Sequence, residues 1–440
     1  MPTTEVKEGK DDDALVCGQG AAAEPTPTKT SSLLAAESTT QKRATDAALS
    51  VRELLMIAVL CGGTMSAKMT CSCVAPFFPE EAEKKSQSRA AIGFIYGSYE
   101  GIVFLSTPLI GTWIPLLRVK NLCVGGLLMN GVASIMFGLL PLCPEGLWFF
   151  WTALVARLLE GLGLAAVATS STTFLTSRFP SRRNRLVGLM ATCVGLSFCM
   201  GPAVGGLLKE WGGFHLPFTV LGLFTISLGL AGVALLGRSE PSEVVSVSRM
   251  LALLRLPAVL LPICGAALPS AAFGVVDSLL EPHLELGSMG VVALFVLLSM
   301  AFSAASVLVG CAVDRTRRPR AVMAAGAILS ATALPLLGPS PLLGRLFHKS
   351  VGSIAASLPL IGAGCAALFV PAFQAIAGIA MSHGYDDSLR TYGIIAGIYH
   401  SSFSFGGFVG PSLGGLGAHN FGFEWTVTIV AGLHFIWVAD

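Results

Sequence analysis

Charged residues are scarce in this sequence of 440 residues. Asp, Glu, Lys and Arg make up 12% of it, while 53% is hydrophobic and the mean hydropathy is +0.73. Soluble domains carry about 25% charged residues, which they keep in water, so a soluble enzyme and a disordered protein are excluded. The net charge of +2 offers no basic surface for nucleic acid. The composition predicts an all-α polytopic membrane protein.

Motifs that carry enzyme or metal chemistry are also lacking. The sequence contains no HExxH or CxxC pair, no nucleophile elbow and no N-x-S/T sequon. Cys71 and Cys73 are only two apart, which is not a zinc spacing. We therefore expect no enzyme activity, no metal and no cofactor. A channel is disfavoured as well, because no selectivity filter or ring of charges is visible.

Residues 1–51 differ from the rest of the chain. They are rich in Thr, Ser, Ala and Glu and contain an acidic run at positions 11–13. No basic segment leads into an apolar core with a small-residue cleavage site, so we do not interpret them as a signal peptide. We expect a disordered tail on the cytoplasmic side.

Beyond this tail, long apolar runs alternate with short polar breaks. A helix of about 20 residues spans the roughly 30 Å of a bilayer's hydrocarbon. The sequence predicts twelve such helices, at about 54–75, 91–113, 119–140, 147–170, 185–208, 214–237, 256–280, 290–312, 321–338, 351–381, 391–416 and 422–440. If the N-terminus is cytoplasmic, the cytoplasmic breaks hold 14 Lys and Arg and the opposite breaks hold six. This bias supports a cytoplasmic N-terminus, because cytoplasmic loops are enriched in basic residues.

The two halves of the chain share short repeated sequence features. Residues 201–206 (GPAVGG) in the fifth span recur 209 residues later as residues 410–415 (GPSLGG) in the eleventh. Pro76 after the first span is matched by Pro282 after the seventh, at an offset of 206. We predict two pseudo-symmetric six-helix bundles, residues 52–237 and 255–440, joined by a cytoplasmic linker at 238–254. Such repeats are typical of transporters, whose substrate site lies between the halves near the midplane.

The repeated stretch carries a resemblance to a known superfamily. Gly201-Pro202, with Gly195 before it and Gly205 after it, resembles the antiporter motif of the major facilitator superfamily, and Gly410-Pro411 is its counterpart. The resemblance implies the major facilitator fold and transport by alternating access. Proline bends a helix and glycine lets helices approach closely. We expect these positions to act as a bend and as a tight seam between the halves.

The loop after the eighth span strengthens this resemblance. Gly310, Asp314 and Arg315, in the pattern G-x-x-x-D-R-x-x-R, resemble the gating loop of the superfamily, which implies a gating role for them. The equivalent loop after the second span keeps Gly111 but has Pro115 at the acidic position. That loop lacks the carboxylate, so the sequence does not predict a symmetric cytoplasmic gate.

Five short stretches carry a finer resemblance. They are residues 75–85 (APFFPEEAEKK), 156–161 (ARLLEG), 273–277 (FGVVD), 410–415 (GPSLGG) and 421–425 (FGFEW). They resemble the vesicular amine transporter family, solute carrier family 18, and within it branch B, a vesicular polyamine transporter. The resemblance covers residues 52–440. It implies a location in the membrane of a vesicle or another acidic organelle, with the plasma membrane as the alternative.

Two positions depart from the monoamine branch of that family. The branch carries an Asp in the first span where this chain has Ser66-Ala67-Lys68, and an Asp in the eleventh span where this chain has His400. Amine recognition in the manner of the monoamine branch is therefore not predicted.

Ionisable residues inside the predicted spans are few. An ionisable side chain at the bilayer centre costs at least about 2.5–3.5 kcal/mol, so such residues face a partner or a water-filled cavity. We interpret them as candidate residues for substrate binding and proton coupling: Lys68, Glu100, Arg157, Glu160, Asp277 and His400, with Glu281 near a membrane edge.

The acidic residues of the first half allow two interpretations each. Arg157 and Glu160 are three apart and share a helix face, which predicts either a structural ion pair or a proton-linked pair. The second is favoured by the resemblance, which places a family Arg at this position. Glu100, next to Tyr99, either meets a cation or pairs with Lys68.

The second half offers a carboxylate pair and a histidine. Asp277 and Glu281 are four apart on one face, either in water at the lumenal mouth or facing a cationic cargo. The resemblance to the family's span-7 carboxylate favours the cargo for Asp277. Separated carboxylates with aromatic faces suit a polyamine. His400 is either a neutral histidine bonded to Ser or Tyr, or part of a proton relay, since histidine titrates near physiological pH.

Together these features predict a proton-coupled antiporter of a small organic cation, a polyamine or a related amine. We expect a monomer in the lipid bilayer that exchanges its cargo for protons and binds no nucleic acid. One alternative is a broad drug or metabolite antiporter. The other is a transport-inactive relative that acts as a receptor or scaffold, which the lost carboxylate and Lys68 favour.

Overall fold

The computed structural model describes residues 49–74, 77–237, 247–283, 288–338, 340–341 and 350–439. Residues 49–440 form one compact unit. Several predictions fall outside the described residues: the tail up to residue 48, Pro76, the linker up to residue 246 and Asp440. The side chain of Glu281 is also outside the description, although its backbone is helical.

Helices account for almost all of the described residues, and no strand occurs among them. The helices are α2 (Val51–Val74), α3 (Phe78–Lys84), α4 (Arg89–Leu117), α5 (Val119–Gly138), α6 (Leu147–Arg178), α7 (Arg183–Gly212), α8 (His215–Leu235), α9 (Val247–Leu254), α10 (Pro257–His283), α11 (Ser288–Thr316), α12 (Pro319–Leu337), α13 (Val351–Ser382), α14 (Leu389–Phe421) and α15 (Phe423–Ala439). Setting aside the short helices α3 and α9, the remaining twelve coincide with the twelve predicted spans.

Ten of these helices are long and apolar enough to cross a membrane. The other two of the twelve are α14, which is rich in Gly and Ser, and α15, which is 17 residues long. Several helices are longer than predicted. For example, α6 continues to Arg178 rather than ending near residue 170, because the polar break that ends a hydropathy run does not end a helix.

Local signals place the helix ends. Ser88 and Ser388 lie just before α4 and α14, where their hydroxyls accept the backbone N–H of Ala91 and Thr391. Gly213 and Gly422 end α7 and α14 with positive φ angles of 75° and 85°, a conformation that favours glycine. These two glycines are 209 residues apart, the same offset as the repeated GPxxGG stretch.

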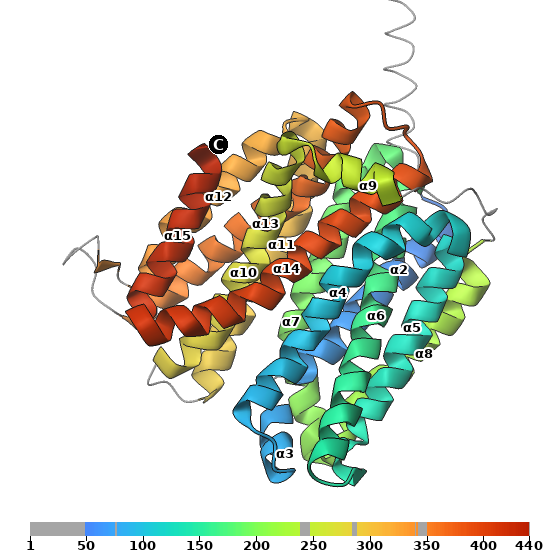
Figure 1. The fold of residues 1–440 in the computed structure, drawn as a ribbon. Helices are drawn as coiled ribbons and strands as arrows, with labels where there is room; N and C mark the ends of the chain where they lie inside the picture. The colour runs from blue at the N-terminus through green and yellow to red at the C-terminus, as the bar shows by residue number, and fades with distance from the viewer. Residues whose placement is uncertain are drawn as a thin grey trace, which may run out of the picture. The chain divides into compact units, whose positions relative to one another are not determined.

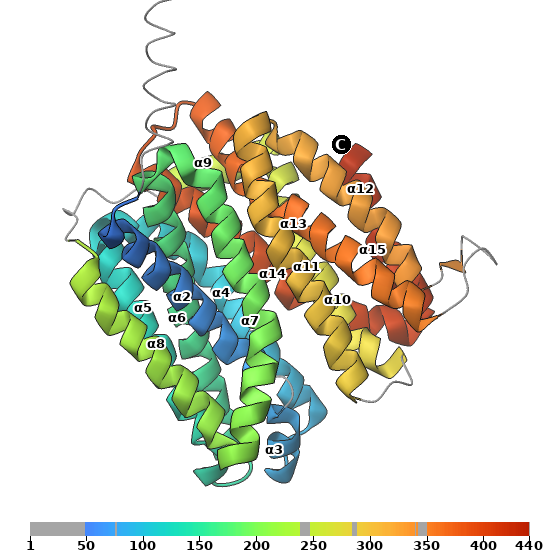
Figure 2. The ribbon, with the colours of Figure 1, turned by 180° about the vertical axis from the view of Figure 1, so that it is seen from behind.

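The helices form two bundles within residues 49–440. Figures 1 and 2 show α2 and α4–α8 gathered on one side and α10–α15 on the other. We call the end at which α2 begins the near end and the opposite end, beside α3, the far end. The predicted fold, twelve transmembrane helices in two pseudo-symmetric six-helix bundles, is confirmed.

Two helix crossings join the bundles toward the near end, and glycines make both possible. Where α7 crosses α11, a Cβ added to Gly310 would lie 2.6 Å from the carbonyl oxygen of Asn184. Where α14 crosses α4, a Cβ on Gly397 would lie 2.6 Å from the oxygen of Thr107. Gly188 and Gly111 complete the two crossings from the other side. Since Gly188 and Gly397 differ by 209 residues, the crossings are equivalent in the two halves.

The glycines of the antiporter-like stretches do not lie in this seam. Gly201 packs against Ser72 of α2, inside the first bundle. Gly410 packs against Ala271 of α10, inside the second, where an added Cβ would lie 2.6 Å from the carbonyl oxygen of Ala271. The expectation of a seam between the halves at these positions was therefore wrong. The proline next to each, Pro202 and Pro411, lies within a continuous helix.

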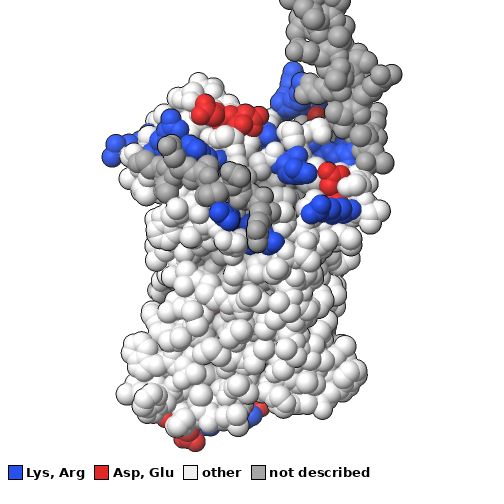
Figure 3. Space-filling view, turned by 90° about the vertical axis from the view of Figure 1, so that its right-hand side faces the viewer, with Lys and Arg blue, Asp and Glu red and all other residues white. Residues whose placement is uncertain are grey.

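Charged side chains lie at the two ends of the bundles. On the face shown in Figure 3, Lys and Arg gather at the near end, and a broad uncharged belt separates them from a few charges at the far end. At the far end, Glu80 accepts from Lys84 at 2.8 Å and from Lys209 at 3.2 Å. These ammoniums hold the pKa of the Glu80 carboxyl below its ordinary value. An uncharged belt of this kind suits the hydrocarbon of a bilayer, where ionisable side chains are costly.

Candidate functional site

Two ion pairs lie inside the first bundle. Lys68 of α2 donates to the carboxylate of Glu100 on α4. Arg157 and Glu160, both on α6, pair at 2.6 Å between Nη1 and Oε2. Arg157 and Glu160 are fully buried and Lys68 is 3% exposed. The structure thus brings together four of the predicted site residues from three helices.

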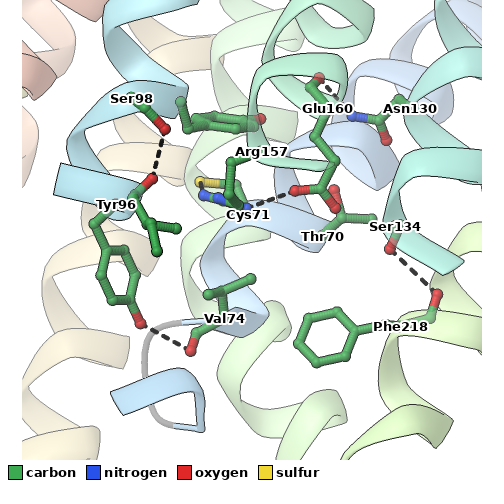
Figure 4. Close-up of polar contacts among 12 residues, drawn as sticks. Thr70, Cys71, Val74, Tyr96, Ser98, Asn130, Ser134, Arg157, Glu160 and Phe218 are labelled. Atoms are coloured by element: carbon green, nitrogen blue, oxygen red, sulfur yellow. Dashed lines mark hydrogen bonds and ion pairs between the residues drawn. The ribbon is translucent and has the colours of Figure 1, made fainter. Parts of the chain in front are cut away.

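The Arg157–Glu160 pair is held on several sides (Figure 4). Nη2 of Arg157 lies 3.3 Å from Sγ of Cys71, and its guanidinium lies over the ring of Tyr99 at 4.4 Å. Asn130 of α5 donates to the backbone oxygen of Glu160 at 2.9 Å. Nε of Arg157 and Oε1 of Glu160 have no hydrogen-bond partner among the described residues. This incomplete satisfaction leaves a donor and an acceptor available inside the protein.

The Lys68–Glu100 pair lies at the border between the two bundles. The ammonium of Lys68 is 5.4 Å from the ring of Tyr99 and 5.3 Å from that of Phe198. A Cβ added to Gly407 of α14, in the second bundle, would lie 3.4 Å from Cδ of Glu100. The pair therefore belongs to the first half but touches the second.

An aromatic stack spans the same border. Phe198 of α7 stacks on Phe273 of α10, with ring centroids 6.0 Å apart and planes 12° apart. Asp277 lies one turn beyond Phe273 on the same face of α10. Its side chain is exposed and makes no ion pair with the described side chains. Asp277 is thus on the face of α10 that meets the first bundle, but it does not join either of the two ion pairs.

His400 connects the halves in another way. Its Nε2 lies 2.8 Å from the hydroxyl of Thr172 on α6, and its ring lies beside Tyr399. The sequence-based interpretation named Ser or Tyr as its hydrogen-bond partner, whereas the structure shows a threonine of the other half. This hydrogen bond joins His400, the residue predicted to relay protons, to α6, the helix that carries Arg157 and Glu160.

The near end is closed by polar contacts between the halves. Asp314 of α11 accepts from Asn184 at 2.8 Å and pairs with Arg185 at 3.2 Å. Arg183 pairs with Asp387 at 3.4 Å and lies over the ring of Tyr392 at 4.2 Å. Asp314 and Gly310 of the predicted gating loop therefore lie at the crossing of α7 and α11.

Sequence reasoning missed the second of these contacts. The loop after the second span has no acidic residue to match Asp314, because Pro115 is there. In its place, Asp387 comes from the turn before α14, and its partner Arg183 comes from the start of α7. Arg315, the third residue of the predicted gating loop, is exposed.

Among the residues that the structure describes, no group of three or more His, Cys, Asp or Glu lies close enough to hold a metal ion. The arrangement instead provides buried cations and carboxylates at a border between two helix bundles. Such a border, closed at one end, is where a carrier with two repeats binds its cargo.

Fold and site together define a multi-pass membrane carrier built from two helix bundles. The family model described as Major Facilitator Superfamily matches residues 60–385 of this chain. The chain belongs to the major facilitator superfamily, whose members are transporters rather than enzymes.

Curated relatives support a finer placement. The chain is 30% identical over 388 residues to the MFS-type transporter SLC18B1 of Homo sapiens, across 86% of this chain and 83% of that one. It is 28% identical over 394 residues to the Mus musculus protein of the same name, across 88% and 85%. It is 24% identical over 389 residues to the synaptic vesicular amine transporter of Mus musculus, across 82% and 68%. The resemblance to solute carrier family 18 is confirmed.

A solved structure supports the fold alone. The crystal structure of the human organic anion transporter MFSD10 superposes with a TM-score of 0.71 at 16% identity, covering 89% of this chain and 99% of that one.

Proposed function

We propose that this chain is a proton-coupled antiporter that moves a small organic cation, a polyamine or a related amine, by alternating access. The observation that carries this proposal is the Lys68–Glu100 pair, flanked by Tyr99 and Phe198 at the border of the two bundles. A carboxylate beside aromatic faces is chemistry that binds an ammonium. The names of the vesicular amine transporters, which are relatives, agree with an amine as cargo.

Several carboxylates are available for a cargo with more than one charge. Glu100 and Glu160 lie within the first bundle, and Asp277 lies on α10 of the second. A polyamine carries ammoniums separated by short carbon chains, so separated carboxylates fit it better than one carboxylate does. We assign Asp277, Glu100 and Glu281 to cargo charge, and Lys68, the Arg157–Glu160 pair and His400 to proton coupling.

The proposed setting is the membrane of a vesicle or another acidic organelle, with the near end in the cytoplasm. The gathering of Lys and Arg at the near end supports this orientation. In that setting, protons leave the acidic lumen as the amine enters it. The near-end contacts of Asp314 and Asp387 then form the cytoplasmic gate, and they are closed in the structure.

Uptake into proteoliposomes tests the proposal. The purified chain is reconstituted with an acidic lumen, and a radiolabelled linear diamine is added outside, with protein-free vesicles as the control for passive trapping. We expect saturable accumulation that collapses when a protonophore dissipates the pH gradient. Asp277→Asn should abolish gradient-driven uptake while the protein still folds, whereas Glu83→Gln, an exposed acid on α3, should leave uptake unchanged.

The same assay separates the alternatives. Accumulation of many unrelated compounds with no preference for amines supports a broad drug or metabolite antiporter. No accumulation of any compound supports a transport-inactive receptor or scaffold. Undiminished uptake by Asp277→Asn removes Asp277 from the mechanism.

A further inference from the structure

Lys68 has the chemistry of the proposed cargo. Its side chain is a flexible chain of four carbons that ends in a primary ammonium, as a linear alkylamine does. This ammonium is held by one carboxylate and two aromatic rings: the carboxylate of Glu100 and the rings of Tyr99 and Phe198. The protein thus holds an alkylammonium of its own at the border where the proposed cargo would bind.

From this geometry we infer that Glu100, Tyr99 and Phe198 form an ammonium-binding site, that Lys68 occupies it as a tethered substitute, and that a cargo ammonium competes with Lys68 for Glu100. This inference rests on the proposed function, because it takes the cargo to be an amine. It goes further by naming the site and the residue that exchanges the proton.

One carboxylate oxygen of this site is available to accept a further hydrogen bond. Glu100 binds Lys68 through Oε1, and its buried Oε2 has no hydrogen-bond partner among the described residues. A second N–H donor can therefore approach the carboxylate before Lys68 leaves it. This acceptor also defines the cargo class. A primary or secondary ammonium carries N–H donors, whereas a quaternary ammonium does not, so the site should prefer the former.

The site lies where alternating access would change it. Lys68 and Glu100 belong to the first bundle, while Gly407 and Phe273 approach from the second. A rocking motion of the bundles alters the surroundings of Glu100 without breaking any helix. The side chain of Glu100 is 16% exposed, against 4% for that of Lys68, so the carboxylate is the more accessible partner.

Charge balance links cargo binding to a proton. Two ammoniums beside one carboxylate would leave an unpaired buried cation, which is costly, and Arg157 adds another positive charge nearby. Lys68 must therefore lose its proton when the cargo takes Glu100. The N–H bond of Lys68 breaks and the proton passes to water on the open side, which leaves a neutral amine and an unchanged total charge in the site. Rebinding of a proton to Lys68 reverses the exchange, so one proton moves for each ammonium held.

The groups that surround Lys68 come from four helices. They are Glu100 of α4, Cys71 of its own helix α2, Arg157 of α6 and His400 of α14. Glu100 favours the charged form of Lys68, and Arg157 opposes it. The opposing charges allow Lys68 to change protonation when a cargo ammonium replaces it, because lysine alters its protonation readily when buried.

Two substitutions of Lys68 test the inference. Lys68→Arg keeps a cation beside Glu100 but cannot release its proton, and Lys68→Met removes the cation. Proteoliposomes are assayed in two ways with a radiolabelled linear diamine: accumulation driven by a pH gradient, and exchange of external for internal amine at equal pH on both sides. For an electroneutral exchange, one pH unit drives about tenfold accumulation for each proton exchanged per cargo molecule.

We expect Lys68→Arg to lose both activities, since its cation never leaves Glu100. Lys68→Met should lose gradient-driven accumulation but keep amine exchange. Lys84→Met removes an exposed Lys–Glu contact on α3 and should change neither activity. If Lys68→Met is too unstable to purify, Lys68→Arg alone decides, because a merely structural role is satisfied by arginine.

Gradient-driven uptake at the wild-type level by either Lys68 variant would overturn the inference while the proposed function stood. Equal uptake of a quaternary ammonium and a primary ammonium would overturn the assigned cargo class. Failure of the wild-type protein to accumulate any amine would instead reject the proposed function, so the two failures are distinguishable.

Discussion

Arg157 and Glu160 are buried charges of opposite sign, and each neutralises the other. Both are fully buried on α6, three residues apart, and they pair at 2.6 Å. Removing one partner of a buried pair leaves an uncompensated charge and destabilises a protein by about 3–5 kcal/mol, whereas replacing both with apolar residues is often neutral. The pair's contribution to stability is therefore best measured with a double variant.

We predict that Glu160→Leu lowers the free energy of unfolding by about 3–5 kcal/mol. The measurement is the melting temperature of the protein in lipid nanodiscs, which should fall. Arg157→Met combined with Glu160→Leu should recover most of that loss. A single variant as stable as the wild-type protein, or a double variant less stable than the single one, would contradict the pairing. The double variant should still lose transport if the pair moves protons.

Gly111 and its partners set how closely the two bundles approach. A Cβ at Gly111 would overlap the backbone oxygen of Gly393 on α14, and one at Gly397 would lie 2.6 Å from the oxygen of Thr107. Overpacking of this kind costs about 1–3 kcal/mol, and here it acts only on the state in which the near end is closed. A substitution in the seam should therefore shift the balance between states rather than unfold the protein.

We predict that Gly111→Ala opens the near end more often, and that Gly206→Ala does not, since an added Cβ at Gly206 meets nothing within 4 Å. The reporter is Ser306→Cys, a fully buried position at the other crossing, in a chain whose 11 native cysteines are replaced. A membrane-impermeant maleimide should label it about tenfold or more faster with Gly111→Ala, for a shift of about 1.4 kcal/mol. Equal labelling rates in the two variants would show that Gly111 does not control closure.

The two near-end contacts differ in their surroundings. The side chain of Asp314 is 15% exposed and has two partners, whereas that of Asp387 is 67% exposed. Exposed ion pairs contribute about 0–1 kcal/mol, and less exposed, hydrogen-bonded carboxylates contribute more.

Asp314→Ala should accordingly raise the labelling rate of the same Ser306→Cys reporter more than Asp387→Ala does. The expected order rests on burial, and it is measured under identical lipid and salt conditions. If Asp387→Ala had the larger effect, the contact of Arg183 with Asp387 and Tyr392 would be the main gate instead.

The helices were predictable because bilayer thickness imposes a length on each apolar run. The run at 119–140 agrees with α5 (Val119–Gly138), and the repeated GPxxGG stretch correctly indicated two related halves. Helix ends agreed less well where a helix continues into water, as α6 does. Hydropathy reports where the hydrocarbon ends and not where backbone hydrogen bonding ends.

The contacts between helices were less predictable. The pairing of Arg157 with Glu160 follows from helical spacing, and the pairing of Lys68 with Glu100 was one of two interpretations. The contact of His400 with Thr172, 228 residues apart, and the seam at Gly188 and Gly397 were missed. These depend on the rotation of each helix about its axis, and spans that are apolar on every side carry little signal for that rotation.

The whole molecule is described by two bundles that meet at the near end and share a set of buried charges. The near-end crossings of α7 with α11 and of α4 with α14 are equivalent by the 209-residue offset. A pivot of one bundle against the other changes both crossings together. The central claim is that this pivot exposes the charged site first to one side of the membrane and then to the other.

Pulsed electron paramagnetic resonance tests that claim directly. In a cysteine-free background, one nitroxide pair is placed at the near end (Leu117→Cys with Asp386→Cys) and another at the far end (Trp211→Cys with Phe421→Cys), all at exposed positions on opposite bundles. Distances are measured in nanodiscs at acidic pH, and at neutral pH with a linear diamine. The account predicts that the near-end distance lengthens and the far-end distance shortens when the amine replaces the proton. Distances that stay constant, or that change in the same direction at both ends, would contradict it.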